Sequence, residues 1–306
     1  MHGHRLIGTG LVALGAGIAA NALLGPLALR LLRFHNSPSG ITQLIGGEAL
    51  SLVVVAPLAV AAGVLWRREH RVAPALALAP AIYALYTYTT EVVGAEYGRY
   101  PGNSARFLPL HLGLLALAGV IAARSSLALA AAPAPSPSTR LRIASATVLL
   151  VPNVLFALAW AAQLAAYAGG ERSLAYQDDP RLWWLIKALD LGLVIPVCLA
   201  AGIGLLLRWP LALKVAPGLT GFLVCLVGAV GAMGLVQVAQ HDPAASWTVV
   251  VVATLAALAE AGVTVWLLRP TTDTEVSPAR SSTSSVPAEE LIGGEVGVTA
   301  PATGGA

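Results

Sequence analysis

KALDLGLVIPVCLAAGIGLLLR, residues Lys187–Arg208, is a helix-length apolar stretch that begins with charged residues and contains one proline. A second stretch with this pattern lies earlier in the chain, at Glu48–Arg67. When Pro57 is placed on Pro196 without gaps, three alanines, two leucines, one valine and one glycine of each stretch coincide. Apolar runs of this kind are typical of membrane-spanning helices. We therefore interpret the chain as an internal duplication built from membrane spans.

The overall composition places the chain in a lipid bilayer. Hydrophobic residues make up 57% of the 306 residues, charged residues only 11%, and the mean hydropathy is +0.77. Soluble domains carry about 25% charged residues, so a chain this apolar could not cover its surface with polar groups in water. The net charge of +3 comes from basic residues that lie beside apolar runs and form no stripe. This distribution gives no support for a nucleic-acid partner.

Eight apolar runs predict an all-α, polytopic transmembrane bundle. A Pro/Ala/Ser linker, residues 131–141, cannot continue a helix and separates two predicted four-helix repeats, residues 1–130 and 142–269. Residues 270–306 are rich in Ser, Thr, Pro and acidic residues, which predicts a disordered tail. The runs cover residues 6–32, 46–66, 72–93, 107–123, 143–168, 183–207, 211–238 and 247–268.

Basic residues predict how the spans are oriented. Eight spans leave both termini on one side, and the loops and ends on that side hold most of the basic residues. This bias places both termini in the cytoplasm. Four spans per half is an even number, so the two repeats would insert in the same direction, as parallel repeats do. Abundant Ala, Gly and Arg with only two lysines is typical of a GC-rich genome, and we expect a bacterial cytoplasmic membrane.

Charged residues beside or inside the predicted spans form the candidate site. Most fall in the outer half of the membrane under this topology, where they could line a pocket between the repeats or form structural ion pairs. Lys187 and Asp190 are three residues apart on one helix face and could neutralise each other. Tyr83, Tyr86 and Tyr88 suit either interpretation. The candidate ligand-binding residues are Glu48, Glu91, His111, Lys187 and Asp190.

Glu260 is an ionisable residue predicted to lie deeper in the membrane. It precedes Arg269 by about nine residues, which puts it roughly 13 Å inside the membrane. We expect its carboxyl group to be protonated or to accept a hydrogen bond from a hydroxyl such as that of Thr264. Possible neighbours from other helices are Asn21, Asn153 and Gln163. Such a group indicates either function or hydrogen bonding between helices.

Three sequence features support a family resemblance. An acidic residue near the start of a span, a proline a few residues later, and Arg-Trp-Pro after the span occur as Asp190, Pro196 and Arg208-Trp209-Pro210. With these motifs the chain resembles an uncharacterised family of multi-pass membrane proteins of bacteria and archaea. The resemblance covers mainly residues 40–124 and 180–215, and the first copy lacks the Trp-Pro pair. It implies a membrane location and a helical architecture, and no activity.

Three classes of function remain after these observations. The first is a transporter or sensor that binds a small polar molecule or an ion in an outward-facing pocket, because helices broken by proline often line binding sites. The second is a structural or accessory membrane subunit, in which charges hold helices together. The third is an intramembrane enzyme, for which the chain contains no catalytic, nucleotide-binding or metal-binding motif. We therefore predict no catalytic residue, metal or cofactor, and we expect charges that converge on one cavity if the first class is correct.

Overall fold

The computed structural model describes residues 2–269, and in this range it contains helices, turns and loops without a β-strand. This confirms the predicted all-α class. The predicted tail, residues 270–306, lies outside the described residues. The described helices are α1 (His2–Leu24), α2 (Pro38–Leu50), the π-helical segment η1 (Ser51–Val55), α3 (Ala56–Arg67), α4 (Ala73–Val93), the 3-10 turn η2 (Ser104–Phe107), α5 (Leu108–Ala131), α6 (Thr139–Ala168), α7 (Leu174–Asp178), α8 (Pro180–Leu189), the π-helical segment η3 (Asp190–Val194), α9 (Ile195–Leu206), α10 (Pro210–Ala239) and α11 (Trp247–Leu268).

Seven helices of the described chain are long and apolar enough to cross a membrane. They are α1, the continuous rod α2–η1–α3, α5 with η2, α6, the rod α8–η3–α9, α10 and α11. α4 has a comparable length of 21 residues but is more polar, because its second half carries tyrosines, threonines and Glu91. It packs against α3, α5 and α10. The chain is therefore a multi-pass membrane protein, whereas the count of eight spans stays a prediction.

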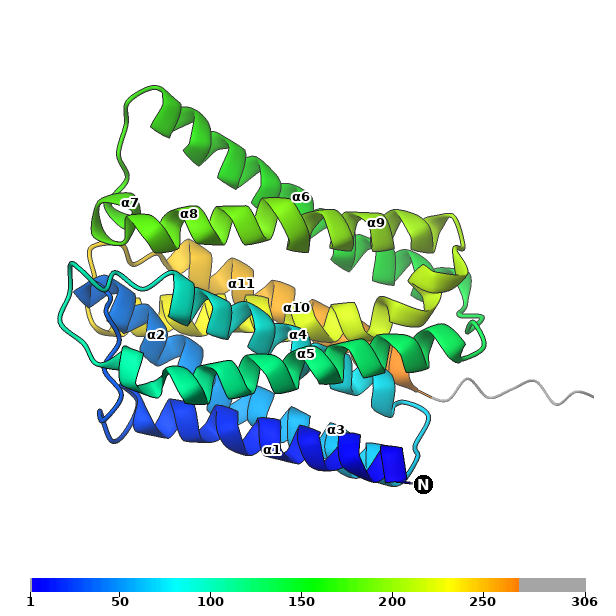
Figure 1. Cartoon of the computed structure of the whole chain (residues 1–306). Helices are drawn as coiled ribbons and strands as arrows, with labels where there is room; N and C mark the ends of the chain where they lie inside the picture. Colours follow the sequence, from blue (N-terminus) through cyan, green and yellow to red (C-terminus); the bar gives the residue numbers. More distant parts are fainter. Residues whose placement is uncertain (1, 270–306) are drawn as a thin grey trace, which may run out of the picture. The chain divides into compact units, whose positions relative to one another are not determined.

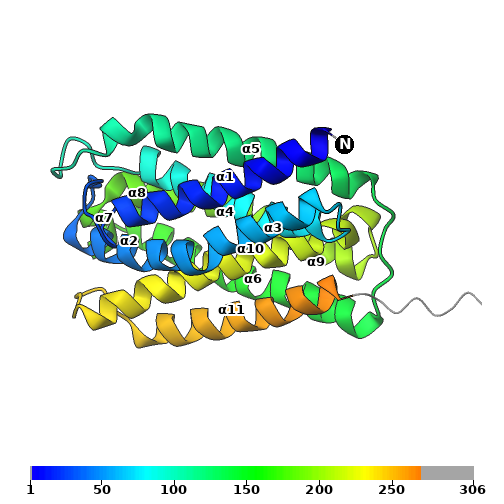
Figure 2. The same cartoon turned by 90° about the horizontal axis from the view of Figure 1, so that it is seen from below.

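The long helices lie side by side in one elongated bundle (Figures 1 and 2). The start of α1 and the end of α11 lie at the same end of the bundle, which we call the terminal end (Figure 1). The opposite end, the loop end, holds the connections at residues 25–37, 94–103, 169–179 and 240–246. Large apolar side chains on α6 and α11 are exposed, as expected of surfaces that face lipid. Examples with 59–65% exposure are Leu155, Leu158, Leu255 and Leu258.

The two halves of the bundle make matching helix pairs. α1 packs against α3 and α5, and α6 packs against α9 and α11; α4 pairs with α5, and α10 with α11. The close approaches also match, since an added Cβ atom on Gly63 would lie 2.7 Å from the Gly8 carbonyl of α1, and one on Gly202 would lie 2.6 Å from Leu150 of α6. Small residues at such contacts let membrane helices pack closely. These pairings are those that two four-helix repeats would make, and the repeat itself stays a prediction.

The two stretches aligned on Pro57 and Pro196 form rods that widen at equivalent positions. The carbonyls of Ser51 and Asp190, the first residues of η1 and η3, each accept a bond from the amide five residues later. Pro57 and Pro196 come directly after those amides. A proline has no amide hydrogen and clashes with the carbonyl four residues before it, so the helix widens into a π-helical turn. Ser51 and Asp190 are the residues that coincide when the prolines are aligned.

The rod α2–η1–α3 begins earlier than predicted. Its first residue is Pro38, and the Ser37 hydroxyl accepts a hydrogen bond from the Gly40 amide. Serine before proline is a favourable start for a helix. Glu48 was expected at the beginning of this helix, and it lies instead about 15 Å inside it, at 1.5 Å per residue.

Prolines also move other predicted boundaries. α1 ends at Leu24, ahead of Pro26, instead of at residue 32, because the residue before a proline is disfavoured in a helix. α8 begins at Pro180, before the predicted start at Trp183. α6 begins at Thr139, inside the predicted linker.

Candidate ligand-binding site

Four polar side chains from four helices meet inside the first half of the bundle, and we call them the carboxyl cluster: Asn21 of α1, Glu48 of α2, Glu91 of α4 and His111 of α5. The Asn21 amide nitrogen donates to Glu48 Oε1 at 2.8 Å and to Glu91 Oε2 at 3.4 Å. His111 Nε2 donates to Asn21 Oδ1 at 2.9 Å and lies 3.7 Å from Glu91 Oε2. Three predicted site residues thus converge around Asn21.

The carboxyl cluster is buried, and its members are at most 5% exposed. In residues 2–269, neither Glu48 nor Glu91 forms a salt bridge with a lysine or arginine. Glu48 Oε2 and Glu91 Oε1 also lack hydrogen-bond partners within this range. No group of three His, Cys, Asp or Glu side chains among these residues has the arrangement of a metal site. The cluster therefore combines two buried acids with one amide and one imidazole.

Asp190 and Lys187 lie in a second polar centre, which we call the aromatic cluster: Tyr86, Trp160, Trp183, Lys187 and Asp190. Tyr86 Oη donates to Asp190 Oδ1 at 2.9 Å, and Trp160 Nε1 donates to Oδ2 at 2.8 Å. The Lys187 ammonium lies 4.2 Å from the ring centroid of Trp160 and 3.7 Å from that of Trp183. The described residues form no Lys187–Asp190 salt bridge. Cation–π contacts hold the lysine instead, and Trp160 contacts both partners.

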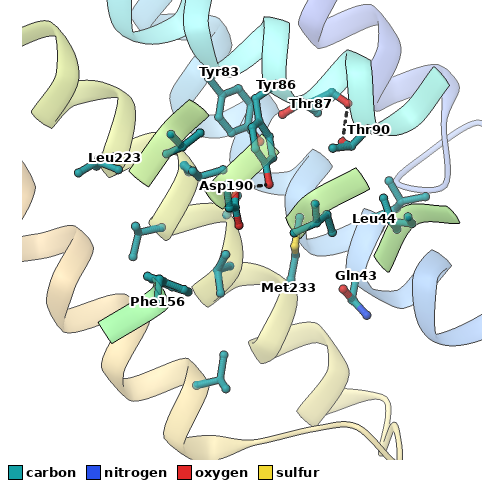
Figure 3. A pocket seen from close by; sticks show the side chains of 18 of the residues that line it. Gln43, Leu44, Tyr83, Tyr86, Thr87, Thr90, Phe156, Asp190, Leu223 and Met233 are labelled. Atoms are coloured by element: carbon teal, nitrogen blue, oxygen red, sulfur yellow. Dashed lines mark hydrogen bonds between the residues drawn. The ribbon is translucent and has the colours of Figure 1, made fainter. Parts of the chain in front are cut away.

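A cavity of about 380 Å³ lies between the two halves, in the part of the bundle nearer the loop end. Side chains of α2, α4, α6, α8, η3, α9, α10 and α11 line it. Figure 3 shows Tyr86 pointing at Asp190, with Phe156, Leu223 and Met233 among the surrounding side chains. Figure 1 shows α6 diverging from α8 towards the loop end. The α6 side of the cavity is formed by this helix's internal proline, Pro152, and by residues that follow it.

The charges that face the cavity are acidic. Glu91 and Asp190 line it, and no lysine, arginine or histidine of the described chain does. Glu48, His111 and Lys187 were expected to face a common pocket, but they lie behind the cavity wall, in the two clusters. Most other lining side chains are apolar or aromatic, so the cavity is less polar than predicted. Glu91 is the one residue that belongs to both the carboxyl cluster and the cavity wall among those described.

Hydrogen bonds between the halves fasten the loop end. The amide and hydroxyl of Ser37 donate to Asp179 Oδ1 and Oδ2 at 3.0 and 2.5 Å. Burial raises the pKa of Asp179, and the bonds from Ser37 oppose this shift. The Arg181 amide donates to Glu96 Oε1 at 2.6 Å. These bonds hold the first turns of α2 and α8 at the end of the bundle where the cavity lies.

Glu260 of α11 is fully buried, and it does not line the cavity. Neither of its carboxyl oxygens has a hydrogen-bond partner in residues 2–269. The predicted partners bond elsewhere: the Thr264 hydroxyl contacts the main-chain carbonyl of Glu260 at 2.7 Å, and the Asn153 amide donates to the Leu149 carbonyl at 2.9 Å. Asn21 belongs to the carboxyl cluster. The partners proposed for this carboxyl group were therefore wrong.

Sequence reasoning missed two tryptophans and the role of Asn21. Trp160 and Trp183 lie in predicted membrane spans. Tryptophan is common where such spans meet the membrane interface, so the residue type alone does not indicate a cation-binding role. A signal for Trp160 is available in the alignment of the halves. With the same offset that places Pro57 on Pro196, Trp160 falls on Asn21. Trp160 contacts Lys187 and Asn21 contacts Glu48, and these two partners also coincide in the alignment.

No protein-family model, no curated protein and no solved structure matches the chain. The resemblance to an uncharacterised membrane family therefore stays a prediction.

Proposed function

We propose that the protein is a transporter or sensor that binds a small organic cation in the cavity between its two halves. The observation that carries the proposal is the lining of the cavity, in which Glu91 and Asp190 are accompanied by Tyr83, Tyr86 and Trp160 without a basic residue of the described chain. Carboxylates attract a cation, and aromatic faces stabilise an ammonium group by cation–π interaction. The apolar part of the lining suits a ligand with a hydrocarbon body.

The proposed orientation opens the cavity to the outside of a bacterial cytoplasmic membrane, with both termini in the cytoplasm. Support comes from the bias of basic residues, because the connections that hold most of them lie at the terminal end and the cavity lies nearer the loop end. The two parallel repeats are part of the same proposal, since the cavity would then lie at the interface of the repeats, as binding sites of repeat-built transporters do.

An accessory subunit without its own ligand is the second candidate. One observation favours it: Glu48, His111 and Lys187 bond or contact residues of neighbouring helices and do not line the cavity. Polar contacts of this kind join membrane helices without any further role. The two candidates differ in whether the cavity binds a cation.

Binding calorimetry on the full chain in lipid nanodiscs distinguishes them. We expect choline to bind saturably and its uncharged carbon analogue, dimethylbutanol, to bind much more weakly. Asp190→Asn removes the charge at constant volume and should lower choline affinity about tenfold or more. Two opposite unit charges about 4 Å apart near a protein surface attract each other by about 4 kcal/mol, and a tenfold change corresponds to about 1.4 kcal/mol. Glu171→Gln, in an exposed loop, is the control and should leave binding unchanged.

Equal binding of the two compounds, or binding of neither, would contradict the proposed function. If choline binds, its uptake into proteoliposomes separates a transporter from a sensor.

A further inference from the structure

The carboxyl cluster contains more acid than its neighbours can neutralise. Glu48 and Glu91 lie side by side, because one oxygen of each carboxyl group accepts from the same Asn21 amide nitrogen, at 2.8 and 3.4 Å. The one basic group in contact with them among the described residues is His111, 3.7 Å from Glu91 Oε2. Even a protonated His111 would leave one negative charge in a site whose members are at most 5% exposed. An unpaired buried charge is strongly disfavoured.

The hydrogen bonds indicate where another proton would be held. Both amide hydrogens of Asn21 are used by Glu48 Oε1 and Glu91 Oε2. Since that amide nitrogen faces the acids, Asn21 Oδ1 faces His111 Nε2, which must be the donor. Glu48 Oε2 and Glu91 Oε1 remain without a partner in residues 2–269, although both side chains are buried. A proton held between the two carboxyl groups would give them a hydrogen bond and remove the repulsion of like charges.

The other titratable side chains around the pair supply no positive charge. Tyr83 and Tyr88 are buried residues of α4, the helix that carries Glu91, and the Tyr83 hydroxyl is bonded to Ser51 Oγ at 2.9 Å. Tyr88 stacks on the His111 ring at a centroid distance of 5.8 Å. Phenol side chains are neutral at physiological pH. The pair must therefore take its counter-charge from a bound proton.

We propose that Glu48 and Glu91 form an intramembrane proton-binding site that holds one proton between them and exchanges it with water in the cavity through Glu91. The path follows from the position of Glu91, which contacts the cluster and lines the cavity. With the proton bound, the pair carries one negative charge. When the proton leaves, a water molecule accepts it and the pair carries two negative charges. This site does not depend on which ligand the cavity takes.

Infrared difference spectroscopy of the full chain in nanodiscs, without any cavity ligand, tests the proposal. At neutral pH the wild type should show a protonated-carboxyl carbonyl band that is removed by alkaline pH. Glu48→Gln and Glu91→Gln should each abolish the part of this band that belongs to the pair. In either variant the new amide donates a hydrogen bond to the remaining acid and no second negative charge faces it, so the remaining acid ionises and gives no protonated-carboxyl band. Glu260→Gln, which changes another buried glutamate, should leave that part intact.

Folding of each variant is checked by size exclusion and helical circular dichroism, and either glutamine variant that folds suffices. A neutral-pH band that both variants leave unchanged would overturn the proposal, because both acids would then be ionised. A band that appears only after sodium ions are removed would also overturn it and would assign the pair to a metal cation. A wild-type protein that shows the band but does not bind choline would refute the proposed function and leave the proton-binding site standing.

Discussion

At the scale of single residues, Asn21 has the largest share of the polar contacts in the carboxyl cluster. Its side chain bonds Glu48, Glu91 and His111, which belong to three different helices. No other side chain of the cluster is hydrogen-bonded to all of the remaining three in the described structure. Replacing it leaves several buried polar groups without a partner, and each such group costs about 1–3 kcal/mol.

We predict that Asn21→Leu lowers the free energy of unfolding by about 3 kcal/mol or more, from the lost partners of two or three buried groups. Asn153→Leu is the matched control, because Asn153 is also buried in a membrane helix but its amide donates to a carbonyl of its own helix. It should cost about 1 kcal/mol or less. Thermal unfolding in detergent can be followed with a thiol-reactive dye, since Cys198 and Cys225 are buried. Equal destabilisation by the two changes would contradict the bridging role of Asn21.

The sequence predicted which residues belong to the polar site better than it predicted what surrounds each of them. Glu48, Glu91 and His111 were selected from the sequence because ionisable groups are rare in membrane helices, yet their convergence on Asn21 could not be predicted. In a helix of a soluble protein the polar face points to water, so the apolar face identifies the side that packs against the core. In a membrane helix the lipid side and the core side are equally apolar, so this contrast is lost. Glu96, which the sequence places in a loop, is likewise buried and accepts the Arg181 amide.

At the scale of helices, the π-helical segments place aligned side chains against α4. Asp190 begins η3 and bonds Tyr86 of α4, while Ser51 begins η1 and bonds Tyr83 of α4. The two rods thus use aligned residues to contact tyrosines three positions apart on one helix. A π-helical turn adds about one residue to a turn, so its removal would rotate everything before it relative to everything after it.

We predict that Pro196→Ala restores the amide hydrogen and lets η3 return to an α-helix. Asp190 would then turn away from Tyr86 and Trp160, and choline affinity should fall about tenfold, which corresponds to about 1.4 kcal/mol. Calorimetry measures the affinity, and thermal unfolding should show unchanged or higher stability, since proline inside a helix is unfavourable. Pro210→Ala, at the first position of α10 where a missing amide costs little, should leave affinity unchanged. Unaltered affinity in Pro196→Ala would mean that the wide turn does not position Asp190.

The sequence predicted the helices well and their ends less well. Long apolar runs identify membrane helices because the bilayer requires them. The starts at Pro38 and Pro180 extend beyond the apolar runs, because capping and proline at the first turn determine a helix start independently of hydropathy. The aligned prolines did indicate that the two rods are interrupted at equivalent positions.

At the scale of the whole molecule, the two halves supply different chemistry to one cavity. The first half contributes Glu91 and, behind it, the buried pair with Glu48; the second contributes Asp190 and, behind it, Lys187 between two tryptophans. Both acids face the cavity, whereas the lysine does not. Because the cavity wall carries two acids and Lys187 lies behind it, we predict that the cavity prefers cations.

The most direct measurement of this claim is the chemical accessibility of Thr87→Cys in intact cells. Thr87 lines the cavity (Figure 3), and the native cysteines are buried. A membrane-impermeant cationic thiosulfonate added from outside should modify the new thiol faster than its anionic sulfonate analogue, and choline should protect it. Gly98→Cys, in an exposed loop at the loop end, should react from outside without protection by choline. Modification of Thr87→Cys only from the cytoplasmic side, or at equal rates with both reagents and without protection, would contradict an outward-facing cation-binding cavity.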